Sequence, residues 1–150
     1  MTLQIKEELL RFRWELWVKM MWNNVVAYLT PGQQLLTPGR GIPPTRQSPF
    51  FVVKIAPNYI DIEIGKSRTF NRLTREMFDA IDTFFQNNLQ TRLRIAAEHS
   101  VTPTPNSVDA VILAAVDFQR AICNYVAAIS EAAGCVRYIM VGNKKYIEVP

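Results

Sequence analysis

His99 is the only histidine in the chain, and together with Cys123 and Cys135 it offers the material for nucleophilic catalysis by a thiol. A cysteine becomes an effective nucleophile when a neighbouring base or charge lowers its pKa. Cys123 lies in an alanine-rich stretch predicted to be a buried helix, and Cys135 begins a predicted strand, so we expect both thiols to be inert. One histidine and two cysteines are also too few for a typical metal site, and we predict no metal and no cofactor.

Asp61, Glu63 and Lys66 lie close together and suggest the carboxylates and lysine of a metal-dependent nuclease. That chemistry needs the lysine two residues after the glutamate, so that both side chains point into one site. Here the spacing is three residues, and we interpret the carboxylates as solvent-facing charges on a half-buried strand. The run Pro38–Gly41 lacks the helix and lysine of a phosphate-binding loop. The sequence therefore predicts no enzyme, with a site of scattered residues around His99 as the alternative.

A basic stretch from residue 66 to residue 75 contains no acidic residue. Its four cationic side chains are Lys66, Arg68, Arg72 and Arg75. Between a strand and the start of a helix, such side chains and free backbone amides can contact the phosphates of a nucleic acid. In the alternative interpretation, Arg72–Glu76 and Arg75–Asp79 pairs neutralise two of the charges along their own helix. The formal net charge of +4 is compatible with both.

Residues 3–28 are predicted to form one long helix with a narrow polar stripe. The stripe consists of Gln4, Glu8, Arg11, Glu15 and Lys19. The rest of the circumference is apolar and contains all three tryptophans. At about 1.5 Å per residue the helix spans roughly 40 Å, so it either crosses the whole domain or extends into another subunit. We expect a protein interface, with core packing as the alternative, at Trp14, Trp17, Met21 and Trp22.

Residues 30–49 form a proline- and glycine-rich segment without hydrophobic periodicity. Loops of this length are uncommon inside a compact domain and are usually either functional or disordered. We expect this arm to wrap around a neighbouring subunit, and to add Leu35 and Leu36 to the interface.

A first hairpin is predicted at about residues 50–65, with Pro57-Asn58 as its turn. The expected apolar pairs on one face are Ile55–Ile60, Val53–Ile62 and Phe51–Ile64. The expected pairs on the other face are Lys54–Asp61 and Val52–Glu63. Because Pro57 is unusual at the start of a tight turn, a shift of the register by one residue is the alternative.

A second hairpin is predicted at about residues 135–149, around a two-residue loop of Gly142-Asn143. Its register places Arg137 opposite Glu148 and Tyr138 opposite Ile147. Because antiparallel hairpins commonly share a sheet, we expect the two hairpins to join in one antiparallel sheet.

Further helices are predicted at residues 73–85 and 89–99, the second with a strand as its alternative. A longer helix is expected to begin at its cap Ser107 and to end at Gly134. With the long N-terminal helix, these elements predict a single α+β domain over residues 1–150.

The composition of the 150 residues is that of an ordinary globular domain, with 49% hydrophobic residues. It contains no apolar run long enough to span a membrane, and its first residues are acidic where a secretory signal would be basic. We expect a cytoplasmic protein, or one within an assembled particle. The favoured hypothesis is a non-enzymatic, oligomerising structural or adaptor subunit of a larger assembly such as a virus-like or phage-like particle. It would bind copies of itself or other subunits. The alternative is a nucleic-acid-binding module that uses residues 66–75.

Overall fold

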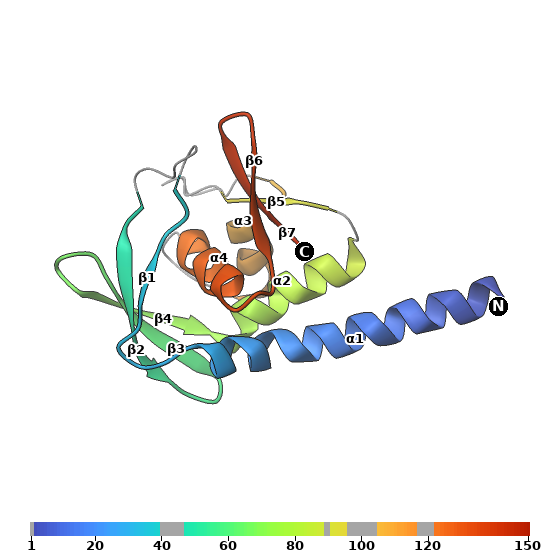
Figure 1. Cartoon of the computed structure of the whole chain (residues 1–150), viewed down its shortest axis with the longest axis horizontal. Coiled ribbons are helices and arrows are strands. Elements are labelled where there is room, and N and C mark those ends of the chain that lie inside the picture. The colour runs from blue at the N-terminus through green and yellow to red at the C-terminus, as the bar shows by residue number, and fades with distance from the viewer. Residues whose placement is uncertain (1, 40–46, 89–90, 96–104, 117–121) are drawn as a thin grey trace.

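The computed structural model describes residues 2–39, 47–88, 91–95, 105–116 and 122–150, and only the backbone of residues 12–20. Helices and strands are mixed along the chain, so the predicted α+β class is confirmed (Figure 1). The helices of this part are α1 (Leu3–Tyr28), α2 (Arg75–Asn87), α3 (Val108–Ala115) and α4 (Cys123–Ala132). The strands are β1 (Gln34–Leu36), β2 (Pro49–Ile55), β3 (Tyr59–Ile64), β4 (Thr69–Thr74), β5 (Leu93–Arg94), β6 (Arg137–Val141) and β7 (Lys144–Glu148).

The strands form two separate antiparallel sheets, in the orders β1-β2-β3-β4 and β5-β7-β6. The two predicted hairpins therefore lie in different sheets, and the prediction that they share one sheet is wrong. Helix α4 lies between the sheets (Figure 1) and contacts both of them. The Tyr125 ring is 5.2 Å from the Phe50 ring of β2, and the Glu131 carboxylate accepts a hydrogen bond from the Tyr138 N–H of β6. Helix α4, with six buried residues, therefore separates the two hairpins.

The pairing of β2 with β3 contains a bulge at Val53. The pairs next to the turn, Ile55–Ile60 and Lys54–Asp61, are as predicted. Beyond the bulge the register shifts by one residue, so three predicted pairs are wrong, and the observed pairs are Val52–Ile62, Phe51–Glu63 and Phe50–Ile64. The extra residue reverses the side on which the preceding side chains point. Phe50 and Val52 are consequently buried, whereas Val53 is 44% exposed.

The β6–β7 hairpin has the predicted register, with Arg137 opposite Glu148 and Tyr138 opposite Ile147. Gly142 has a φ of +64°, as the two-residue loop requires. The strand β5 pairs with the other side of β7, so the helix expected over residues 89–99 is wrong for the described residues 91–95. Residues 89–90 and 96–99 of that prediction lie outside the described residues.

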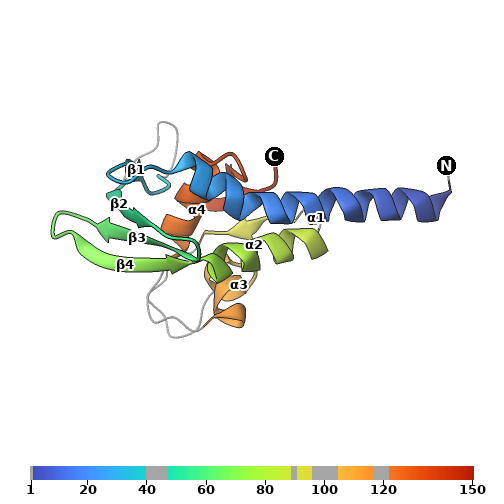
Figure 2. The same cartoon turned by 90° about the horizontal axis from the view of Figure 1, so that it is seen from below.

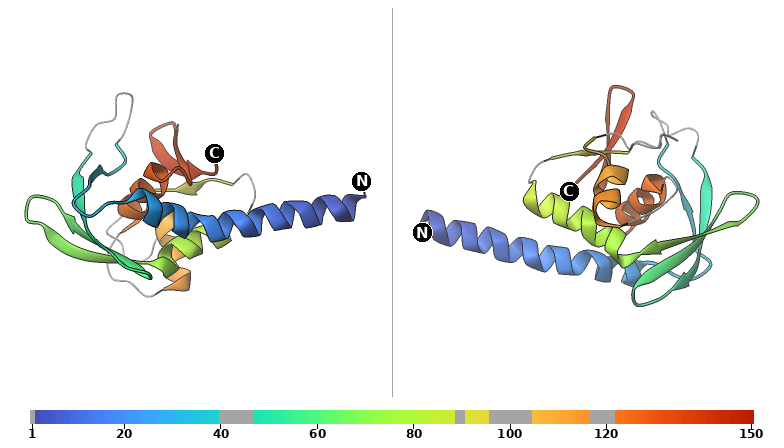
Figure 3. Two further views of the ribbon diagram at one scale, coloured as in Figure 1. Left: turned by 60° about the horizontal axis from the view of Figure 1, so that its bottom comes forward. Right: turned by 180° about the vertical axis from the view of Figure 1, so that it is seen from behind.

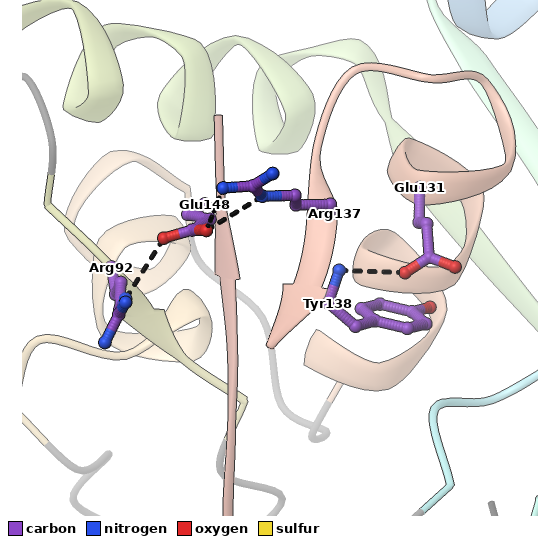
Figure 4. A network of polar contacts seen from close by, with 5 residues as sticks. All are labelled: Arg92, Glu131, Arg137, Tyr138 and Glu148. Carbon is purple, nitrogen blue, oxygen red and sulfur yellow. Dashed lines mark hydrogen bonds and ion pairs between the residues drawn. The ribbon is translucent and has the colours of Figure 1, made fainter. Parts of the chain in front are cut away.

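One carboxylate, that of Glu148 on the central strand β7, ties the second sheet together (Figure 4). It accepts hydrogen bonds from Arg137 Nε at 2.8 Å and from Arg92 Nε, just before β5, at 3.0 Å. These bonds, first that from Arg92, hold the pKa of Glu148 below its ordinary value. The bond from Tyr138 N–H to Glu131 occupies a backbone donor of the edge strand β6 that no strand pairs (Figure 4).

Two helix boundaries differ from the prediction. Helix α2 begins at Arg75 instead of residue 73, because Leu73 belongs to β4, where it is fully buried and pairs with Ile60. The helix expected from Ser107 to Gly134 is two helices, because α3 ends at Ala115 and α4 begins at Cys123. Residues 117–121 of that prediction lie outside the described residues.

The start of the third helix is as predicted, since Ser107 Oγ accepts a hydrogen bond from the Ala110 N–H at 3.2 Å. Asp109 then links the two short helices. Burial raises the pKa of its carboxyl group, the backbone and thiol of Cys123 and the backbone of Ile122 lie close enough to oppose this, and its Oδ1 atom has no hydrogen-bond partner. An acid at the N-terminus of α4 also interacts favourably with the helix dipole.

Candidate functional site

The N-terminal part of α1 extends beyond the rest of the molecule (Figures 1 and 2). Every residue from 2 to 11 is exposed. Four of the exposed side chains are large and apolar: Leu3 at 75%, Ile5 at 46%, Leu9 at 48% and Leu10 at 48%. Scattered single apolar side chains are normal on a surface, but four within one projecting helix form a surface that a partner can cover.

The core-facing side of α1 changes character along the helix. In its second half, Trp22, Val25 and Leu29, where the helix ends, are buried against the domain. Fourteen residues before Trp22 and Val25, the same side of the helix carries Glu8 and Arg11 of the predicted stripe. In the projecting part, the polar side chains therefore continue the domain side of α1, and the apolar side chains lie on its other sides.

Part of the predicted helix interface is wrong. Met21 and Trp22 are 1% and 3% exposed and belong to the core of their own chain, so another subunit cannot reach them. Trp22 Nε1 donates a hydrogen bond to the Pro57 carbonyl oxygen at 3.1 Å, and its ring centroid is 5.5 Å from that of Phe78. The side chains of Trp14 and Trp17 lie outside the described residues.

The arm folds back on its own domain over residues 34–39. Leu35 of β1 is half-buried and pairs with Phe50, whereas Leu36 is 47% exposed. Thr37 exchanges two hydrogen bonds with Ser48, and Lys145 Nζ donates to the Pro38 carbonyl oxygen at 2.7 Å. Residues 34–39 therefore pack on their own domain, and their contact with a neighbouring subunit stays a prediction; residues 40–46 lie outside the described part.

The basic stretch is mostly the strand β4, which the sequence analysis did not predict. Three of its cations pair with carboxylates of the same chain. Arg68 Nη2 is 3.2 Å from Glu63 Oε1. Arg72 donates bidentate hydrogen bonds to the Asp61 carboxylate at 2.8 and 3.2 Å. Arg75 Nε is 3.4 Å from Asp79 Oδ2. The expected Arg75–Asp79 pair is thus confirmed, but Arg72 pairs across the sheet instead of along a helix with Glu76. Lys66 is exposed.

The helices cover one face of the first sheet and leave its outer face open (Figure 3). The same arginines stack on aromatic rings at positions that alternate with the buried Ile60, Ile62 and Leu73, and therefore on that outer face. The Arg68 guanidinium carbon is 3.8 Å from the ring centroid of Phe51, and that of Arg72 is 3.8 Å from the ring centroid of Tyr59. Phe70 between them is 57% exposed. This face therefore combines flat rings and guanidinium groups, which suit stacking with another planar group.

Neither cysteine is activated. Both thiols are free and buried, and burial raises the pKa of Cys123, to which the neighbouring Asp109 adds. Burial and the nearby Asp82 raise the pKa of Cys135 to about 11. Neither group is a thiolate at neutral pH, and His99 lies outside the described residues.

Asp82 of α2 is a buried carboxylate that the sequence analysis did not single out. It is fully buried, and neither of its oxygens has a hydrogen-bond partner. Burial, with a smaller contribution from Asp79, raises its pKa to about 9. Without access to solvent it is suited to influence stability, not to bind a ligand.

Among the described residues, no three metal-ligating side chains come together, and no helix there is sufficiently long and apolar to cross a membrane. Comparison with known proteins finds no matching family model, no similar curated protein and no similar solved structure. The exposed part of α1 and the outer face of the first sheet therefore stand as the two candidate interaction surfaces on their geometry alone.

Proposed function

We propose that this chain is a non-enzymatic, oligomerising subunit of a larger assembly, and that the exposed N-terminal part of α1 makes the contact between subunits. The observation that carries this proposal is the placement of Leu3, Ile5, Leu9 and Leu10 on a helix that projects past the domain. Burying a leucine or isoleucine side chain contributes roughly 1.5–3 kcal/mol, so four of them can stabilise an association.

The test is to replace Leu3, Leu9 and Leu10 together by serine and to measure the mass in solution by light scattering coupled to size exclusion. We expect the wild-type chain to be an oligomer at micromolar concentration and the triple variant to be a monomer. A control variant replaces Val53, Leu113 and Val141 by serine.

The control residues are apolar side chains outside α1, and their exposed fractions are 44% for Val53, 38% for Leu113 and 45% for Val141. Their replacement should leave the mass unchanged, because they lie on other surfaces. A monomeric wild-type chain, or a control variant that dissociates as readily as the α1 variant, would contradict the proposal.

Binding of single-stranded nucleic acid to the outer face of the first sheet is the second candidate function. The exposed Phe70 beside the stacked Arg68 and Arg72 favours it, because bases stack on aromatic rings and guanidinium planes of open sheets. The ion pairs with Glu63 and Asp61 weigh against it, since they reduce the positive charge that phosphates would meet.

For this candidate, replacing Phe70 by alanine should weaken binding of a fluorescently labelled oligonucleotide by roughly tenfold, since one stacked base contributes about 1–3 kcal/mol. Replacing the exposed but non-aromatic Val53 by alanine should have no effect. Fluorescence anisotropy at increasing salt measures both the affinity and its electrostatic part. Absence of binding at low salt would exclude this function for the sheet.

A further inference from the structure

We propose that the edge strand β4 pairs antiparallel with β4 of a second copy of this chain, so that the first sheets of two copies join across a two-fold axis at Asn71. This contact is separate from the α1 surface of the proposed function. The turn between β3 and β4 lies at the end of the molecule opposite the N-terminus of α1 (Figures 1 and 2). A subunit with one contact at each end can join more than two copies, as a larger assembly requires.

The backbone groups on one side of β4 point to an open edge of the sheet. Among the described strands, β3 alone pairs with β4. The Arg75 N–H donates to the Asn58 carbonyl oxygen at 2.8 Å, a pair that continues the register of β3 with β4. Hydrogen-bonded and non-bonded pairs alternate in an antiparallel ladder, so every second residue counted back from Arg75, Asn71 among them, bonds to β3. The N–H and C=O groups of Phe70 and Arg72 therefore point away from β3.

Strand β4 lacks the features that usually keep an edge strand from pairing. Edge strands are commonly protected by short length, proline, a bulge or charged side chains. β4 has six residues, whereas the opposite edge strand β1 has three. Its sequence, TFNRLT, contains no proline, and its register with β3 is continuous. Its one charged residue, Arg72, already pairs with Asp61. The edge is therefore open to the backbone of another strand.

The sequence of β4 is complementary to a second copy of itself. Directly opposed residues of an antiparallel pair lie on the same face of the sheet. With the axis at Asn71, Phe70 faces Arg72 of the second copy, and Arg72 faces Phe70 of the second copy. Both residues lie on the outer face and turn their backbone groups to the open edge, so each of these pairs can exchange two hydrogen bonds. The ring and the guanidinium group attract each other as well.

Like charges disfavour the neighbouring symmetric registers. With the axis at Arg72, the two Arg72 side chains would face each other. With the axis at Phe70, Arg72 would face Arg68 of the second copy. Like charges directly opposite each other across two strands are destabilising. The axis at Asn71 is the register of these three in which each cation meets a ring instead of a cation, and this self-complementarity favours a second copy as the partner.

Cysteine cross-linking of the full chain tests the register. In this register the residues at position 71 form the central, non-hydrogen-bonded pair, with Cα atoms about 4.5 Å apart and within reach of a disulfide. Because Cys123 and Cys135 are buried, Asn71→Cys introduces the thiol that can react. A contact made by one short strand is weak, so the protein is used well above micromolar concentration. Oxidised glutathione should then join most of the Asn71→Cys chains into dimers.

Thr69→Cys is the matched control, because it lies on the same strand and the same face. Thr69 is exposed and Asn71 only partly, so random collisions would favour cross-linking of Thr69→Cys. In the proposed register the two residues at position 69 are about 13 Å apart along the strands, too far for a disulfide. We expect several-fold less dimer from Thr69→Cys than from Asn71→Cys.

Phe70→Pro, added to the Asn71→Cys chain, tests the pairing of the backbones. Proline removes an N–H group that β3 does not use, so the fold and the circular dichroism spectrum should persist. The same N–H group donates to the second copy in the proposed contact. Cross-linking should therefore fall to the level of Thr69→Cys.

The outcomes separate this inference from the proposed function. Preferential cross-linking of Asn71→Cys that Phe70→Pro abolishes supports the paired strands, whether or not the wild-type chain is an oligomer at micromolar concentration. Equal cross-linking of the two cysteine variants, or cross-linking that survives Phe70→Pro, overturns the paired strands. Either of these results leaves association through α1 to its own test, the serine variant of Leu3, Leu9 and Leu10.

Discussion

Replacing Asp82 by asparagine is expected to stabilise the protein most strongly in mildly alkaline solution. In the folded chain this carboxyl group has a pKa of about 9, against an ordinary value of 3.8, because it is buried and neither of its oxygens has a hydrogen-bond partner. Unfolding at neutral pH therefore releases a proton. The free energy of unfolding of the wild type should fall as the pH rises from 3.8 towards 9, by at most about 1.4 kcal/mol per pH unit.

The measurement is urea denaturation of wild type and Asp82→Asn between pH 5 and pH 8, followed by circular dichroism. An amide does not titrate, so the free energy of unfolding of the variant should not fall with pH in the way that Asp82 causes in the wild type. The difference in free energy of unfolding between Asp82→Asn and the wild type should therefore grow in favour of the variant by roughly 2–4 kcal/mol between pH 5 and pH 8. Glu76→Gln is the matched control, because Glu76 lies on the same helix but is exposed and does not contribute to the raised pKa of Asp82. Equal slopes for wild type and Asp82→Asn would contradict the prediction.

The sequence predicted those elements that short-range signals define. The bounds of α1 follow from its composition, and the register of β6 with β7 follows from the positive φ that Gly142 can adopt. The cap at Ser107 is a further local signal that the structure confirms.

The bulge at Val53 was not predictable from the alternation of side chains. Residues 50–53 are four apolar residues in succession, so either alternate pair can face the core. The choice of Phe50 and Val52 depends on contacts outside the hairpin, such as the edge-to-face packing of Phe50 with Tyr125 of α4. The strand β4 escaped prediction for a related reason, since Leu73 is its one buried residue and Arg72 finds its partner Asp61 on another strand.

The candidate site on α1 could be predicted only in part. Sequence periodicity shows that α1 is apolar over most of its circumference, but it does not show where the domain ends. That boundary decides which apolar residues are covered by the chain itself. Met21 and Trp22 lie on the covered half, and Leu9 on the exposed half, although all three have comparable apolar character. The large size of tryptophan directed the sequence-based interface to Trp22, which lies on the covered half.

Trp22 is therefore expected to be a residue of folding stability, and not of association. Trp22→Ala should lower the free energy of unfolding by about 3–5 kcal/mol, because it leaves a cavity beside Phe78 and removes the hydrogen bond to Pro57. Trp22→Phe keeps an aromatic ring in the core and should cost less, about 1–2 kcal/mol, most of it from the unpaired Pro57 carbonyl.

Chemical denaturation of both variants, beside light scattering of the folded fraction, distinguishes the two roles of Trp22. Tyr28→Ala is the control, since Tyr28 lies on the same helix but is 45% exposed, and its loss should change stability by less than about 0.5 kcal/mol. A Trp22→Ala variant with undiminished stability that fails to associate would reverse the assignment and make Trp22 an interface residue. A destabilised variant whose folded chains still associate would show that the α1 surface and the core anchor at Trp22 are separate parts of one helix.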